Sequence, residues 1–186
     1  MQEAVFDTTT DFESVNLYFY DECRFGLFTR NGKMLTARGI KPICPFQQVF
    51  QSLYLFGAYS PLDGDSCMTE MPACNAVTFQ AFLVELGQQK PKELKIVALD
   101  NAPFHKAESL VIPENIKLIF LPPYSPELNP AEKIWAILKR KFTNQMHHSL
   151  KEISQFMDKE TKELTKEIIK SVCAYQYIYQ NIDWTT

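Results

Sequence analysis

The sequence has no excess of basic residues and no long hydrophobic run. Its 186 residues include 19 Lys and Arg against 22 Asp and Glu, which gives a formal net charge of −3. A histone-like or polybasic binder is therefore excluded, and any contact with nucleic acid has to come from a local patch. No apolar run reaches the roughly 18 residues of a membrane-spanning helix, so no membrane partner is expected.

The sequence also lacks a cysteine pattern and a targeting segment. Its 5 cysteines are odd in number, form no C-x-x-C pair and have no histidine at zinc-ligand spacing. Neither a disulfide framework nor a structural zinc is expected, and a reducing cytoplasm is the predicted location. Residues 1–14 are acidic and carry no basic residue, unlike a signal peptide, and are expected to form a linker or a disordered N-terminus.

What the sequence does contain is sufficient for one globular domain. Hydrophobic residues make up 46% of the chain, with 14 Phe, 8 Tyr and 2 Trp. A chain of this length buries roughly 70% of its unfolded surface, which is enough for a core without metals or disulfides. We expect one domain over residues 15–186, with a core at 15–142 and C-terminal helices at 149–186.

The first third of the chain is predicted to form strands. Residues 15–20 alternate apolar and polar side chains, the period of a strand that runs into Asp21. Residues 25–28 and 34–36 flank Asn31-Gly32, a dipeptide typical of two-residue turns, and predict a hairpin. Residues 49–59 are a long aromatic and apolar run that predicts a further strand.

The rest of the chain is predicted to combine helices with two short buried strands. Apolar spacing predicts helices at 75–89, 130–142 and 150–172, the last opened by a Ser149-x-x-Glu152 capping box. Residues 95–99 and 116–121 are nearly continuous apolar runs, typical of strands buried on both faces. The predicted fold class is therefore α/β, a mixed sheet of an antiparallel meander plus parallel strands, flanked by helices.

Three carboxylates stand out by their positions. Asp21 and Asp100 each follow a predicted strand, and Glu132 opens a predicted helix. Ligand crevices in open α/β sheets form at the carboxyl ends of strands, so these side chains are expected to converge. Converging carboxylates need a counter-charge, and hard oxygen ligands favour Mg²⁺ or Mn²⁺. Two such ions could clamp the attacking and leaving oxygens of a phosphodiester.

Each carboxylate also has a structural interpretation. Asp21 and Asp100 could be ordinary turn residues after their strands. Glu132 fits position N3 of a capping box, with Asn129 as N-cap and Pro130 at N1. Spacing alone leaves these alternatives open.

The surrounding segments resemble a known catalytic core. Residues 99–107 read LDNAPFHKA and residues 121–132 read LPPYSPELNPAE. Together they resemble the Asp-Asp-Glu transposases of the bacterial insertion sequence 630 family, relatives of the mariner transposases. Tyr20-Asp21-Glu22 matches the first acidic motif of that family. The interval of 31 residues between Asp100 and Glu132 is slightly shorter than the family pattern.

The resemblance implies an RNase H-like fold and a bacterial transposase that cuts and joins DNA. It implies that Asp21, Asp100 and Glu132 bind two Mg²⁺ or Mn²⁺ ions. It also implies three partners: element and target DNA, a second copy of the chain, and a helix-turn-helix module. The chain starts only 20 residues before Asp21, so that module is expected on a separate polypeptide or in a longer protein.

Two other functions remain open at this stage. One is another RNase H-like nuclease. The Asn-Pro-x-Glu motif at the start of the predicted helix argues against it, because that motif is part of the resemblance to transposases. A domesticated or decayed transposase domain that binds DNA without cutting is the other. The missing module and the short interval favour such decay, whereas the three retained carboxylates argue against it.

Basic residues near the proposed triad are candidate DNA contacts. Residues 23–41 contain basic but no acidic side chains, and residues 133–148 do so again. The predicted phosphate-binding residues are Arg24, Arg30, Lys33, Arg38, Lys139 and Arg140. Cations at residues 139–141 could equally complement the dipole of a helix end. His105 is predicted to touch a phosphate or orient a metal ligand, the alternative being a loop histidine without a special role.

Overall fold

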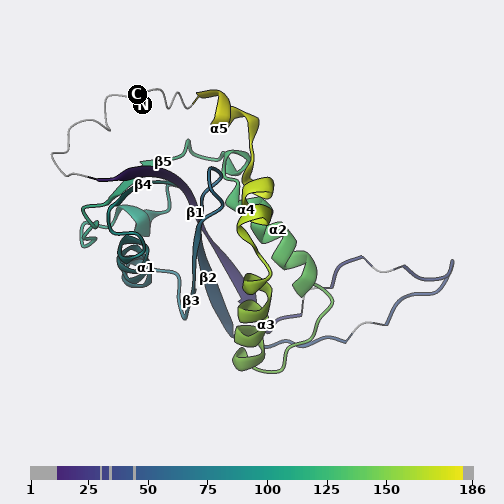
Figure 1. The fold of residues 1–186 in the computed structure, drawn as a ribbon. Helices are drawn as coiled ribbons and strands as arrows, with labels where there is room; N and C mark the ends of the chain where they lie inside the picture. The colour runs from purple at the N-terminus through teal and green to yellow at the C-terminus, as the bar shows by residue number, and fades with distance from the viewer. Residues whose placement is uncertain (1–11, 30, 34, 44, 182–186) are drawn as a thin grey trace.

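The computed structural model describes residues 12–29, 31–33, 35–43 and 45–181. These residues form one five-stranded mixed sheet with helices on both faces (Figure 1). The strands, in the order β3-β2-β1-β4-β5, are β1 Ser14–Gly26, β2 Ser52–Tyr59, β3 Ser66–Met71, β4 Glu93–Leu99 and β5 Ile116–Phe120. The helices are α1 Ala76–Gln88, α2 Ala131–Phe142, α3 Leu150–Lys162, α4 Lys166–Cys173 and α5 Gln176–Asn181. None of the helices in the described ranges is long and apolar enough to cross a membrane.

The central strand β1 has two different neighbours along its length. Its first half pairs in parallel with β4, and its second half pairs antiparallel with β2. The parallel register ends where Phe19 lies opposite Ala98. Continuing that register by two residues places Asp21 opposite Asp100. β1 therefore extends beyond the end of β4 and leaves an open edge where the two aspartates meet.

The two faces of the sheet carry separate cores. On one face α1 packs Phe79, Phe82 and Leu83 against Tyr20, with the Tyr20 and Phe82 ring centroids 4.9 Å apart. The other face is covered by α2, α3 and α4, whose cluster includes Trp135. The predicted mixed sheet of a meander plus parallel strands is confirmed. Trp135 is fully buried in the second core.

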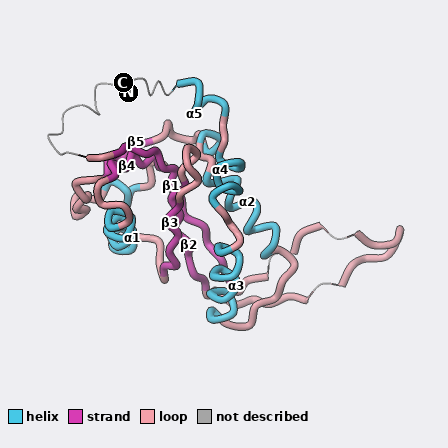
Figure 2. Tube along the Cα trace, viewed as in Figure 1, coloured by secondary structure: helices cyan, strands magenta, loops and turns pink. Residues whose placement is uncertain are grey.

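The hairpin predicted around Asn31-Gly32 is wrong. β1 ends at Gly26, and its antiparallel partner is β2, which starts only at Ser52. The described residues between them form no strand and extend from the domain as a long loop (Figure 2). Met34, in the second predicted arm, lies outside the described residues. The neighbouring Leu35 is fully exposed, so this arm has no core face to hold it against a partner.

Other boundaries differ from prediction for local reasons. The predicted strand 49–59 begins only at Ser52, and β3 was not predicted. The predicted helix 150–172 is two helices, because Thr165 caps a new start by accepting a hydrogen bond from the Ile168 N–H. Ser149 caps α3 as expected, but Glu152 accepts from the His148 N–H rather than completing the capping box. The helix predicted at 75–89 is confirmed as α1.

Candidate active site

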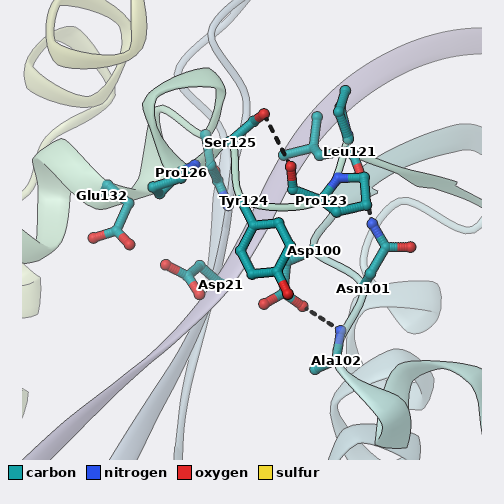
Figure 3. Close-up of a pocket in the computed structure, with 12 residues that line it drawn as sticks. Asp21, Asp100, Asn101, Ala102, Leu121, Pro123, Tyr124, Ser125, Pro126 and Glu132 are labelled. Atoms are coloured by element: carbon teal, nitrogen blue, oxygen red, sulfur yellow. Dashed lines mark hydrogen bonds between the residues drawn. The ribbon is translucent and has the colours of Figure 1, made fainter.

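A cavity of about 430 Å³ lies where β4 ends beside the middle of β1 (Figure 3). All three predicted carboxylates line it: Asp21 from β1, Asp100 from the end of β4 and Glu132 from the first turn of α2. Its remaining wall is the proline-rich loop between β5 and α2. The three side chains therefore converge on one cavity, as predicted, although they come from elements far apart in the sequence.

Two hydrogen bonds hold Asp21 in place. One carboxylate oxygen accepts from the Glu22 N–H at 2.9 Å, and the other accepts from the Trp135 Nε1–H at 2.9 Å. Trp135 is buried on α2 and packs edge-on against Tyr59, with ring centroids 5.6 Å apart. Because the indole cannot move within this core, it fixes the direction of the Asp21 carboxylate.

The pKa of Asp21 is raised to about 7. Burial is the largest cause, followed by the negative charge of Glu22, and the charge of Glu132 adds to them. The bonds from the Glu22 N–H and Trp135 oppose this rise, because they favour the ionised form. A divalent cation would oppose this rise, because its positive charge offsets the repulsion among the carboxylates.

Asp100 is more open than Asp21. Its side chain is 60% exposed, and one oxygen accepts from the Ala102 N–H at 2.9 Å, which closes a tight turn after β4. The neighbouring Asn101 donates to the Leu121 carbonyl at the end of β5. This bond ties the Asp100 turn to the loop that forms the opposite wall.

The capping interpretation of Glu132 is not what the structure shows. Asn129 accepts from the Ala131 N–H at 3.1 Å and donates to the Tyr20 carbonyl at 2.9 Å, so it joins the start of α2 to β1. The Glu132 carboxylate makes no hydrogen bond to any described residue and instead lines the cavity (Figure 3). It is therefore free to bind a cation or substrate.

His105 and Glu22 contact each other beside Asp100, a pairing that the sequence does not predict. The His105 Nε2 lies 2.7 Å from a Glu22 oxygen, and its Nδ1 lies 2.8 Å from Asp100 Oδ1. The second contact is short but outside hydrogen-bond geometry, so we treat only the first as a hydrogen bond. His105 is buried among aromatic rings, which does not fit the predicted phosphate contact but fits a role in orienting a metal ligand.

The closest group of acidic side chains lies elsewhere. Among the described residues, the oxygens of Asp63, Asp65 and Glu93 lie within 4.8 Å of one another. Three lysines pair with them: Lys90, Lys95 and Lys166. This group is electrically balanced by the protein itself, so its closeness does not require a metal ion.

The Asp21, Asp100 and Glu132 set has no such balance. No Lys or Arg in the described part of the chain lies within ion-pair distance of any of the three. Carboxylate oxygens facing an open cavity match the donor set that Mg²⁺ or Mn²⁺ prefers. The residues present therefore fit divalent cations.

The predicted DNA contacts are placed differently from one another. Arg24 and Lys139 line a second cavity of about 230 Å³. Lys33 and Arg38 are exposed in the loop between β1 and β2, and Arg140 is exposed on α2. Arg30 lies outside the described residues. Among the predicted contacts that the structure describes, only Arg24 and Lys139 are brought together at one cavity.

Comparisons with known proteins agree with this geometry. The family described as DDE superfamily endonuclease matches residues 16–154. An uncharacterized protein, y4pE/y4sA of Sinorhizobium fredii (strain NBRC 101917 / NGR234), is 38% identical over 87 residues, which cover 46% of this chain and 64% of that protein.

Solved structures of the Mos1 mariner transposase share the fold. The paired-end complex with Mn matches at a TM-score of 0.67 and 18% identity, and the complex with Mg at 0.66 and 16%. Each match covers 85% of this chain and 51% of the Mos1 chain, so this chain spans about half the length of those proteins. The predicted RNase H-like fold is confirmed. With its carboxylates at the cavity and the family matched over most of its length, the chain belongs to the DDE superfamily endonucleases.

Proposed function

We propose that this chain is the catalytic domain of a transposase of the insertion sequence 630 type, which cuts DNA strands and joins them to a target. The observation that carries the proposal is that Asp21, Asp100 and Glu132 line one cavity without a Lys or Arg partner among the described residues. The acidic cluster near Lys90, by contrast, is already paired with lysines.

Two Mg²⁺ or Mn²⁺ ions held by the three carboxylates would activate the attacking oxygen and stabilise the leaving oxygen of a phosphodiester. The protein's own part is positioning. Trp135 and the Glu22 N–H hold Asp21, the Ala102 N–H holds Asp100, and Asn129 sets the start of the helix that carries Glu132. Such prepositioned charges lower a barrier because they need no rearrangement during the reaction.

The partners of this domain follow from the same proposal. The Mos1 structures are described as paired-end and strand-transfer complexes, with a transposon end in one of them. For this chain we propose binding of element and target DNA in a homodimer, with a helix-turn-helix module supplied by another polypeptide or another part of the protein. A bacterial cytoplasm is the proposed setting.

The test is Mn²⁺- or Mg²⁺-dependent nicking of supercoiled plasmid. Asp100→Asn and Glu132→Gln keep the shape of each side chain and remove its charge, and both are expected to lower the nicking rate at least 100-fold. Glu114→Gln, an exposed carboxylate away from the cavity, is the matched control and should nick like the wild type. Circular dichroism confirms folding in each case.

Three results would contradict the proposal. Nicking that survives Glu132→Gln would return Glu132 to a structural role. Divalent-ion binding without any nicking, even with the DNA-binding module added in trans, would identify a catalytically silent domain. Nicking of RNA in preference to DNA would instead identify another RNase H-like nuclease.

A further inference from the structure

A second cavity lies along the same two elements that carry Asp21 and Glu132. It has a volume of about 230 Å³ and lies between the end of β1 and the C-terminal part of α2. Arg24 and Lys139 contribute the charge, and Phe28 and Phe50 contribute aromatic surface. We call this cavity the aromatic pocket.

The charge of the aromatic pocket is uncompensated. No acidic side chain lines it. The Arg24 Nε–H donates to the Ser52 Oγ at 3.0 Å, and the rest of the guanidinium makes no ion pair with a described residue. Lys139 likewise has no acidic partner in the described ranges. Two exposed cations next to each other without a counter-charge favour an anionic ligand.

The aromatic surface of the pocket is arranged for a flat ligand. Phe28 and Phe50 stack with ring centroids 5.5 Å apart and an interplanar angle of 29°. Phe50 is 73% exposed and Phe28 is 39% exposed, although the nearby Phe25 and Phe142 pack inward against each other. Exposed ring faces beside cations are the combination that binds unpaired bases together with their phosphates.

The pocket and the triad are separated by similar lengths along β1 and α2. Arg24 follows Asp21 by three residues on β1, about 10 Å at the rise of a strand. Lys139 follows Glu132 by seven residues on α2, about 10 Å at the rise of a helix. The seven-residue spacing puts Lys139 on the same helix face as Glu132, at a length of about three nucleotides of a stacked strand. The three-residue spacing puts Arg24 on the face of β1 opposite Asp21.

We propose that the aromatic pocket binds an unpaired nucleotide of the DNA strand whose phosphodiester lies at the triad. This inference rests on the proposed function, because it takes that strand as the substrate. A base inside a duplex keeps both faces stacked and cannot use the rings, so the pocket selects unpaired DNA at the cleavage site. A second copy of the chain fits less well, since two copies would bring their Arg24 and Lys139 charges together.

The test measures binding rather than cleavage. Fluorescence anisotropy with a labelled 20-nucleotide single strand and with a hairpin duplex is performed in EDTA. Phe50→Ala is expected to weaken single-strand binding about 10-fold and duplex binding less than about 2-fold. Phe50→Trp should retain the preference for single strands. Val77→Ala, a similarly exposed apolar side chain on α1, is the control.

The charges are tested through salt dependence. The double variant Arg24→Gln/Lys139→Gln should reduce the slope of log K against log salt by about 1.4 for single strands, whereas Lys170→Gln on α4 should leave it unchanged. An equal loss of single-strand and duplex binding in Phe50→Ala, or an unchanged slope in the double variant, would overturn the proposal.

The outcome separates this inference from the proposed function. If the wild type nicks DNA and the pocket variants bind single strands normally, only the pocket is wrong. If single-strand binding depends on Phe50 but no nicking occurs, only the catalytic proposal is wrong. A change in sedimentation of Phe50→Ala with unchanged DNA binding would make the pocket a contact between copies and overturn the nucleotide site.

Discussion

Two groups of three carboxylates lie at the two ends of β4. Asp63, Asp65 and Glu93 cluster where the strand begins, and Asp21, Asp100 and Glu132 line the cavity where it ends. The first group has the closer oxygens, but lysines compensate it. The second has no such compensation among the described residues. The comparison shows that counter-charge, rather than closeness, distinguishes a structural acidic cluster from one available to a metal ion.

The lysine-paired cluster connects several elements of the fold. Glu93 and Lys95 are buried side by side at the start of β4, and the Tyr18 hydroxyl on β1 donates to Glu93 at 2.9 Å. Lys166 reaches Asp65 from α4. Burial lowers the pKa of Lys95, while the charge of Glu93 raises it again. This cluster therefore stabilises the fold only as long as its charges stay paired.

The largest expected effect is on stability. Glu93→Ala leaves the Lys95 ammonium and the Tyr18 hydroxyl without their buried partner, so we expect a loss of about 3–5 kcal/mol in the free energy of unfolding. Glu132→Ala, at the other end of β4, removes an exposed and unpaired carboxylate and should change it by less than about 0.5 kcal/mol. Urea unfolding at pH 7 measures both. Equal losses would remove the distinction between the two groups.

The second group, through Asp21, should also make the stability of the fold depend on pH. The pKa of Asp21 is raised in the folded state to about 7 from a reference value of 3.8, so the folded protein holds a proton that the unfolded chain releases. Stability should therefore fall as the pH rises from about 4 to 7, by at most about 4 kcal/mol. Unfolding measured in EDTA across this range tests it.

Asp21→Asn is the matched variant for this pH effect. It has no proton to lose, so it should be more stable than the wild type above pH 7 and about equally stable near pH 4. A wild type whose stability rises between pH 4 and 7, with no difference from Asp21→Asn, would contradict the raised pKa.

Divalent cations should act on the uncompensated group only. A cation at 100 times its dissociation constant is expected to stabilise the folded state by about 2.7 kcal/mol. Asp21→Asn and Glu132→Gln should abolish this gain, and Asp63→Asn should retain it. Thermal unfolding with and without Mn²⁺ measures the difference. A gain that disappears with Asp63→Asn would place the ion in the lysine-paired cluster at the start of β4 and contradict the prediction.

The cavity was predictable because its residues lie in short, specific segments. Asp100 directly follows an apolar run that predicts a strand, and Asp21 follows an alternating run that does the same. The predicted strand end at Asp21 is wrong, because β1 continues to Gly26, but the parallel register of β1 and β4 still brings both aspartates together. Glu132 was ambiguous, because its spacing from Asn129 fits a capping box. Only the three-dimensional structure shows that the Asn129 amide donates to the Tyr20 carbonyl, and that Glu132 faces the cavity instead of completing a capping box.

Contacts between distant residues could not be predicted in the same way. Glu22 lies next to Asp21 but on the other face of β1, where it meets His105 from 83 residues away. The lysine-paired cluster likewise joins residues from β4, α4 and the turn before β3. The false hairpin at Asn31-Gly32 has the same cause, since a turn signal is local whereas strand pairing depends on a buried face.

The smallest expected effect concerns the bond from Trp135 to Asp21. Trp135→Phe keeps an aromatic ring in the core but removes the Nε1–H that favours ionised Asp21, so the pKa of Asp21 should rise further. A lost hydrogen bond of about 1 kcal/mol moves that pKa upward by less than about one unit. The upper end of the pH range over which stability falls should move by the same amount, whereas its lower end stays near the unfolded-state pKa. Some overall stability is lost with the smaller ring at any pH, so the position of the pH transition, rather than stability itself, is the measurement.

In an Asp21→Asn background the same substitution should leave the pH profile unchanged, because its effect acts through the Asp21 carboxylate. A downward movement of the transition would mean that Trp135 fills space in the core without holding the carboxylate for a cation.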